Sequence, residues 1–176
     1  MLCIIVIFIV SFEVLGIWDL LGFFPPSKNR VEKIFQKCEN ELSVICQYSN
    51  DDNLENYDFS IDLFDSTTRI KCFEQSANGG YDKSEYTITD KKLLNTLKSV
   101  QKKGVFRILK EYDYLYFQIW GSFGESVGLI YSEGKEPDLS SVNAEKIVVE
   151  RLKAENWFYR NTIVPKFPDH MPYKSS

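Results

Sequence analysis

The chain has 176 residues, of which 44% are hydrophobic and 15% aromatic, a composition typical of a packed sheet rather than of a disordered chain. All 21 basic residues follow Pro26, together with 23 of the 25 acidic residues, so that part of the chain has a net charge of −2. A surplus of acid excludes polyanion binding through overall charge, and we expect no nucleic-acid partner.

The first 26 residues are almost entirely apolar and end at two prolines, which predicts a membrane anchor or a signal sequence. A membrane-spanning helix needs about 20 mostly apolar residues. Glu13 and Asp19 interrupt the run, and an acidic side chain near the bilayer centre costs roughly 2.5–3.5 kcal/mol on insertion scales. A cleaved secretory signal begins with basic residues, which this run lacks. A buried core helix is the remaining alternative for residues 1–26.

Residues 27–162 have the length of one domain, and their periodicity predicts how it begins. Residues 27–48 form an amphipathic helix with Ser27 as its N-cap, because apolar residues recur at three- and four-residue steps. These residues are Val31, Ile34, Phe35, Cys38, Leu42, Ile45 and Cys46. Residues 57–64 alternate between apolar and polar side chains, which predicts a half-buried strand, and residues 68–74 are its expected partner.

The second half of the domain is predicted to begin with a helix and continue as strands. Thr89 or Asp90 caps an amphipathic helix that ends at Lys102, and Gly104 stops it. Short apolar segments with short connections then predict antiparallel strands. These are residues 105–110, 114–120, 127–131, 146–152 and 157–160. The predicted fold class is α+β: an N-terminal apolar helix, then two amphipathic helices packed on one face of a mainly antiparallel sheet.

The side chains that carry catalysis or bind metals are sparse. His170 is the single histidine and lies in residues 163–176, where three prolines predict an extended or mobile tail. Cys38 and Cys46 lie about 12 Å apart along one predicted helix, too far for a disulfide. Either one pairs with Cys72 in an oxidising compartment, or all three are buried thiols. No ligand spacing indicates a metal, and we expect neither a metal nor another cofactor.

Aromatic side chains are concentrated in the C-terminal strands, and two alternatives account for them. They either pack in the core or form an exposed face that binds a partner. The candidate binding residues are Tyr114, Tyr116, Trp120, Tyr131, Trp157 and Tyr159, with Arg107 at the rim of the face.

Three acidic residues, Asp58, Asp62 and Asp65, lie on or beside the predicted strand 57–64. Glycoside hydrolysis runs on two carboxylates, so these residues make a carboxylate-based hydrolase at the cell surface the alternative function. Acidic residues that alternate along a strand also form an ordinary solvated face.

Several short segments resemble one family. They are Phe24–Ser27, Val31–Phe35, Phe117–Trp120, Gly128–Ser132, Gly134–Pro137 and Asn156–Tyr159. On these segments the chain resembles small membrane-anchored proteins of uncharacterised function from low-GC Gram-positive bacteria, although Phe158 stands where that pattern usually has tyrosine. The resemblance implies a membrane anchor and a single domain, and it implies no catalytic residues.

We therefore expect a non-enzymatic protein-interaction or accessory module, held in the cell membrane through residues 1–26. The resemblance, and the ability of an apolar leader to act as an uncleaved signal, favour a domain on the extracytoplasmic side. The positive-inside rule favours the opposite side, because basic residues follow the apolar run. These residues are Lys28, Arg30, Lys33 and Lys37.

Overall fold

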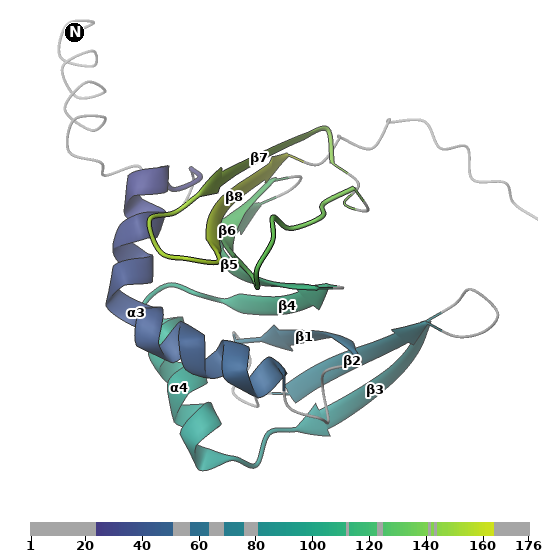
Figure 1. Cartoon of the computed structure of the whole chain (residues 1–176). Coiled ribbons are helices and arrows are strands. Elements are labelled where there is room, and N and C mark those ends of the chain that lie inside the picture. The colour runs from purple at the N-terminus through teal and green to yellow at the C-terminus, as the bar shows by residue number, and fades with distance from the viewer. Residues whose placement is uncertain are drawn as a thin grey trace, which may run out of the picture.

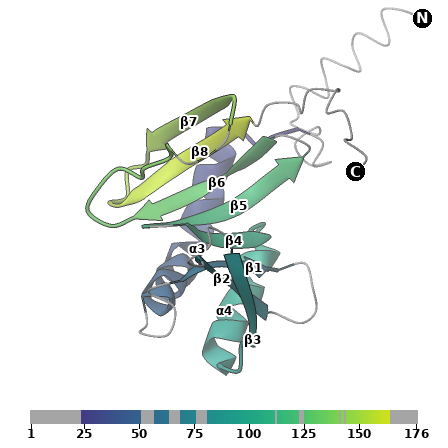
Figure 2. The same ribbon diagram turned by 90° about the vertical axis from the view of Figure 1, so that its right-hand side faces the viewer.

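Eight antiparallel strands form one sheet in the order β3-β2-β1-β4-β5-β6-β8-β7 (Figure 1). The computed structural model describes residues 24–50, 57–63, 69–75, 81–111, 113–122, 125–140, 142 and 144–163. The strands are β1 (Asp58–Asp62), β2 (Arg69–Gln75), β3 (Tyr81–Thr87), β4 (Arg107–Glu111), β5 (Tyr114–Ser122), β6 (Glu125–Ser132), β7 (Lys146–Arg151) and β8 (Trp157–Ile163). The sheet twists strongly, so that β5 to β8 run across β1 to β3 at a steep angle (Figure 2).

Two helices, α3 (Lys28–Ser49) and α4 (Lys91–Lys102), lie on the same side of this sheet (Figure 1). The prediction of an α+β fold with an antiparallel sheet is confirmed. The fold class is corrected to an eight-stranded antiparallel sheet with these two helices, because the described residues contain no third helix. The predicted N-terminal apolar helix falls on residues 1–23, which lie outside the described residues. Neither described helix combines the length and the apolar character that crossing a membrane requires. Residues 164–176 of the expected tail also lie outside the described residues.

The helix α3 forms where the periodicity predicts it, because one stripe of its surface is buried. Ser27 precedes the helix with an extended backbone, and its carbonyl oxygen accepts hydrogen bonds from the amides of Arg30 and Val31. The stripe consists of Val31, Phe35, Cys38, Leu42, Ile45 and Cys46, none of them more than 5% exposed. Burial of this stripe, rather than intrinsic propensity, supplies most of the helical stability.

The helix α4 begins and ends at the residues that the sequence predicts. The Asp90 carboxylate accepts hydrogen bonds from the backbone N–H groups of Lys92 at 2.6 Å and Leu93 at 2.9 Å, and so satisfies donors that a helix start leaves open. Gly104 follows the last turn with a φ of +106°, and its N–H donates to the carbonyl oxygen of Gln101. A residue without a Cβ is favoured there because L side chains rarely adopt this conformation.

The helix α3 crosses several strands of the sheet and is tied down near both ends. At about 1.5 Å per residue, its 22 residues span roughly 33 Å. Near its start, the Lys28 ammonium lies 2.5 Å from the Glu150 carboxylate of β7. At its end, the Lys110 ammonium of β4 donates a hydrogen bond to the Ser49 carbonyl oxygen. One helix therefore connects the β7 edge of the sheet to its middle.

The strand β3 is the one that the sequence analysis missed. The described side chains from Asp82 to Thr87 are all exposed, and β3 pairs only with β2 at the edge of the sheet. A strand shows alternation in its sequence when one of its faces is buried. Because β3 buries neither face over these residues, no alternation marks it.

The strand β5 buries both of its faces, as a central strand does. Leu115 and Phe117 belong to the main core beneath the helices. Tyr114 and Tyr116 belong to a second, smaller core on the opposite face, together with the side chains of Ile130 and Phe158. Leu139, from the connection between β6 and β7, packs against this second core. Both faces of the sheet are therefore covered around β5, and only one of them is covered by helices.

A β-bulge interrupts the pairing of β5 with β6. The register shifts between Gln118 and Trp120, and Gly128 is the partner of Gln118. A Cβ at Gly128 would collide with the carbonyl oxygen of Phe117 and would lie 2.8 Å from Cε2 of Tyr116. Only glycine lets the backbone and the Tyr116 ring come this close.

We predict that Gly128→Ala lowers the free energy of unfolding by about 2 kcal/mol, because the new methyl group would collide with the backbone of Phe117, which cannot move aside easily. Gly121→Ala is the matched control, since its Cβ would mainly meet the end of the flexible Gln118 side chain, and it should cost less than about 0.5 kcal/mol. Urea denaturation of both variants measures the difference. Equal losses would mean that the close approach at Gly128 is not a constraint on the fold.

Candidate functional site

The aromatic candidates are divided between the two faces of the sheet. Tyr114 and Tyr116 lie in the smaller core, on the face opposite the helices. The other four lie on the side of the helices: Trp120, Tyr131, Trp157 and Tyr159. No single surface of the structure brings all six together, so each group has to be considered separately.

Trp157 is the centre of an aromatic cluster beneath α3. Its ring centroid lies 5.0 Å from that of Phe35, 5.2 Å from that of Tyr131 and 5.5 Å from that of Phe117, in tilted arrangements. Aromatic pairs at such distances stabilise a fold beyond the area they bury. Tyr159 is buried as well, and burial raises the pKa of its hydroxyl. The ring contacts of Trp157 therefore hold α3 against β5, β6 and β8.

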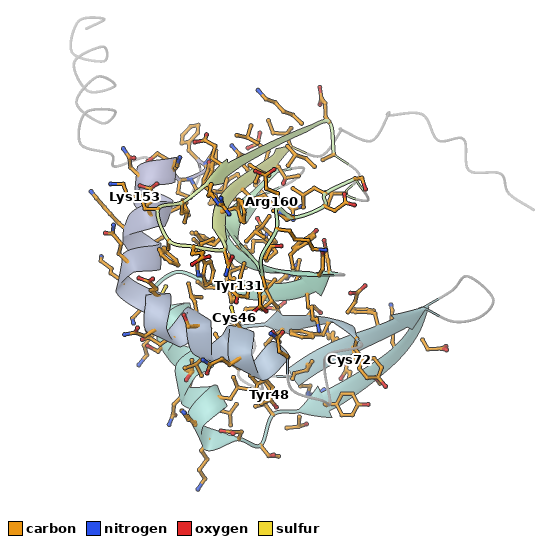
Figure 3. The ribbon with its side chains drawn as sticks, viewed as in Figure 1. Cys46, Tyr48, Cys72, Tyr131, Lys153 and Arg160 are labelled. Atoms are coloured by element: carbon orange, nitrogen blue, oxygen red, sulfur yellow. The ribbon has the colours of Figure 1, made fainter. Side chains whose placement is uncertain are left out.

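Tyr114 and Tyr116 surround a buried arginine on the opposite face. The Tyr114 hydroxyl donates a 2.5 Å hydrogen bond to the Glu111 carboxylate, and burial raises the pKa of Tyr116 to about 12. The Arg160 guanidinium lies 4.4 Å from the centre of the Tyr116 ring and donates to the Thr162 hydroxyl at 2.7 Å. Figure 3 shows Arg160 among the strands of the C-terminal half of the sheet. Arg160 is only 5% exposed, so this cation contributes to packing through its contact with the ring.

A small cleft of about 180 Å³ lies where α3 ends beside β5 and β6. Its lining includes two of the aromatic candidates, Tyr114 and Tyr131, with Lys110 and Asp113 beside them. The Lys110 ammonium is engaged by the Ser49 carbonyl oxygen at 3.3 Å. The cleft is smaller than the roughly 300–1,000 Å³ of typical small-molecule sites.

Arg107, the predicted rim residue, lies exposed on β4. Its guanidinium is 3.4 Å from the Asp62 carboxylate of β1. An ion pair this exposed contributes at most about 1 kcal/mol, because water and salt screen it.

Trp120 lines a larger groove, of about 450 Å³, formed by the first half of α3, the end of α4 and the end of β5. We call this site the basic groove. Its lining residues are Phe24, Pro26, Arg30, Lys33, Ile34, Lys37, Lys102, Lys103, Gly104, Ile119 and Trp120. Five of them are basic and none is acidic, although the chain as a whole carries a negative net charge. The groove is therefore a local concentration of positive charge.

The positive charge arises from the way α3 is turned about its axis. Arg30, Lys33 and Lys37 follow one another at three- and four-residue steps, which places them on one flank of the buried stripe. Glu32 and Glu39 lie on the other flank, where they line a separate cleft of about 220 Å³. The buried stripe thus lies between Arg30, Lys33 and Lys37 on one flank and Glu32 and Glu39 on the other.

The end of α4 contributes the remaining two lysines. Lys103 forms an ion pair with Glu41 of α3, and the same carboxylate accepts a 2.9 Å hydrogen bond from the Ser99 hydroxyl. The hydrogen bond from Lys103 lowers the pKa of the Glu41 carboxyl. This contact fixes the end of α4 against α3 and so places Lys102 and Lys103 at the groove.

The sequence predicts only part of this site. In the sequence, Arg30, Lys33 and Lys37 stand out only as basic residues that follow the apolar run, and there they bear on membrane orientation alone. Lys102 and Lys103 come much later in the chain and reach the groove only through the packing of α4 against α3. The three- and four-residue spacing of Arg30, Lys33 and Lys37 indicates that they share one side of a helix. The position of Lys102 and Lys103 beside them follows only from the tertiary structure.

The three described cysteines are free and buried. The Cys38 thiol donates a hydrogen bond to the Ile34 carbonyl oxygen, and burial raises its pKa to about 11. Burial also raises the pKa of Cys46 and of Cys72. The Cys46 side chain belongs to the buried stripe of α3 and lies near Tyr131 at the main core (Figure 3). Of the two alternatives for these cysteines, buried thiols are the one observed.

No protein-family model, curated protein or solved structure matches this chain. Within the described residues, no group of three or more histidine, cysteine or acidic side chains is gathered closely enough to hold a metal ion.

We predict that Trp157→Ala lowers the free energy of unfolding by about 3–5 kcal/mol, because it removes the centre of the aromatic cluster. Trp120→Ala should cost only about 1 kcal/mol, since Trp120 is partly exposed at the groove. Denaturant titration followed by circular dichroism compares the two variants. If both variants unfold, Trp120 is also a core residue and is no candidate for binding.

We predict that Cys38, Cys46 and Cys72 of the native protein react very slowly with a thiol reagent at about pH 8. The thiolate is the reactive form, and burial keeps the pKa of Cys38 at about 11, so its thiolate is scarce until the pH approaches that value. Reaction in denaturant should be rapid, and mass spectrometry identifies the modified residues. Rapid native labelling of Cys38, Cys46 or Cys72 would contradict the burial of these thiols.

Proposed function

We propose that this protein is a non-enzymatic interaction module anchored in the cell membrane through residues 1–26. The observation that carries the proposal is the continuity between the apolar run and the basic groove. Phe24 and Pro26 close the apolar run, and both line the groove. The chain passes directly from an apolar segment to a surface with five basic side chains and Trp120. Basic residues and tryptophan are enriched where proteins meet the headgroup layer.

The proposed orientation is extracytoplasmic, with the apolar run acting as an uncleaved signal. The resemblance to small membrane-anchored proteins supports this side, and the basic residues of α3 support the opposite one. Protease added to intact cells distinguishes the two. Digestion of the folded domain supports the extracytoplasmic orientation, and protection until the cells are lysed would reverse it.

The proposed partner is a protein that docks near the aromatic candidates that keep some exposure. Trp120 and Tyr131 are partly exposed, whereas Tyr114, Tyr116 and Trp157 are buried. Trp120 belongs to the basic groove, so Tyr131 and the cleft at the end of α3 remain the aromatic surface for such a partner.

The hydrolase alternative finds no support in the described carboxylates. Asp58 and Asp62 lie four positions apart on β1, about 13 Å at 3.3 Å per residue. The paired acids of glycoside hydrolases are about 5–9.5 Å apart. Asp62 is also paired with Arg107, and Asp65 lies outside the described residues. No observation therefore favours this second function.

We predict that the full chain fractionates with membranes and stays there after high-salt and alkaline washes, because the anchor is held by apolar transfer rather than by charge. A variant lacking residues 1–23 should be released into the soluble fraction by high salt. Immunoblotting of both fractions measures this. Recovery of the full chain in the soluble fraction would contradict the proposed function.

A further inference from the structure

The basic groove has a feature that anchoring alone does not explain. An apolar run is sufficient to hold a chain in a bilayer, and anchoring requires no concave basic site beside it. Yet α3, α4 and β5 together form a groove with five basic side chains at the point where the apolar run ends. Its position and charge indicate a ligand in the membrane itself.

We infer that the basic groove binds the headgroups of anionic phospholipids and thereby holds the folded domain against the membrane surface. This inference rests on the proposed function, because it requires the apolar run to be inserted in the bilayer. Lys33 and Lys37 come from one helix and Lys102 from another, so the charges converge on the groove from two sides. Phosphate oxygens accept hydrogen bonds from lysine and arginine side chains, and several such contacts act together near an anionic surface.

The apolar lining of the groove agrees with a site at the bilayer interface. Trp120 and Ile119 come from the end of β5, and Phe24 is 53% exposed. Tryptophan prefers the headgroup level, where its ring meets apolar atoms and its N–H meets polar ones. A soluble phosphate site would need no exposed aromatic surface, and a nucleic-acid site would need positive charge over a wider area. A lipid headgroup with the first part of its acyl chains fits both parts of the lining.

The test compares the chemical labelling of the groove lysines with that of lysines outside the groove in the same molecule, which serve as internal references. The full chain is reconstituted into nanodiscs of neutral phospholipid, or of neutral phospholipid mixed with an anionic one, and is treated with an amine-reactive reagent. We expect the labelling of Lys33, Lys37 and Lys102 to fall at least about threefold in the anionic discs. Lys91 and Lys92 lie about 15 Å away along α4, and their labelling should change little.

A pair of matched variants assigns the protection to the groove. Lys33→Glu with Lys37→Glu should remove most of the protection of Lys102 in anionic discs. Lys91→Glu with Lys92→Glu changes the net charge by the same amount and should leave that protection intact. Circular dichroism confirms that both variants are folded. Equal loss in the two variants would show a general effect of net charge and would overturn the inference.

Two further results decide between this inference and its rivals. Equal labelling of the groove lysines in neutral and anionic discs overturns lipid binding, while recovery of the chain in the discs leaves the anchor intact. Full protection in neutral discs by added inorganic phosphate would make the groove a soluble-anion site and also overturns the inference. Failure of the chain to enter discs at all would instead contradict the proposed function.

Discussion

The packing of α3 across the sheet is the interaction on which the rest of the structure depends. The contact of Phe35 with Trp157 fixes the first half of the helix against β8, and the hydrogen bond of Lys110 to Ser49 fixes its end against β4. The glutamate at position 41 adds α4 to the same assembly through Lys103. A twisted eight-stranded sheet has little to hold its two ends in one arrangement, and α3 supplies that constraint by bridging strands that are not neighbours.

The same packing determines where the charges lie. With the apolar stripe of α3 facing the sheet, the flank with Lys33 and Lys37 faces the groove and the flank with Glu32 faces away. A rotation of the helix by one residue position, roughly 100°, would mix the two sets and bury a charge. The basic groove is therefore a consequence of the fold. The net negative charge of the whole chain does not predict it.

The sequence predicts most elements that have a buried face. It does not predict elements or contacts that leave no periodic pattern of apolar residues. Local chemistry determines the buried stripe of α3, the cap at Asp90 and the helix end at Gly104, so the sequence predicts all three. The strand β3 is not predicted, since neither of its faces is buried and it has no alternation. The aromatic candidates are divided between two faces of the sheet, and periodicity does not say which face of a two-sided sheet is covered. Lys102 joined the site only through the meeting of two helices.

Native-state hydrogen exchange of Phe35→Ala tests most directly whether α3 makes the sheet one cooperative unit. If α3 is the common constraint, the most protected amides of β1 and β4 should lose the same free energy of protection as those of β6 and β8. That loss should also match the drop in global stability measured by denaturation. Loss confined to β6 and β8, with β1 and β4 unchanged, would show that the two parts of the sheet are stable independently and would contradict this account.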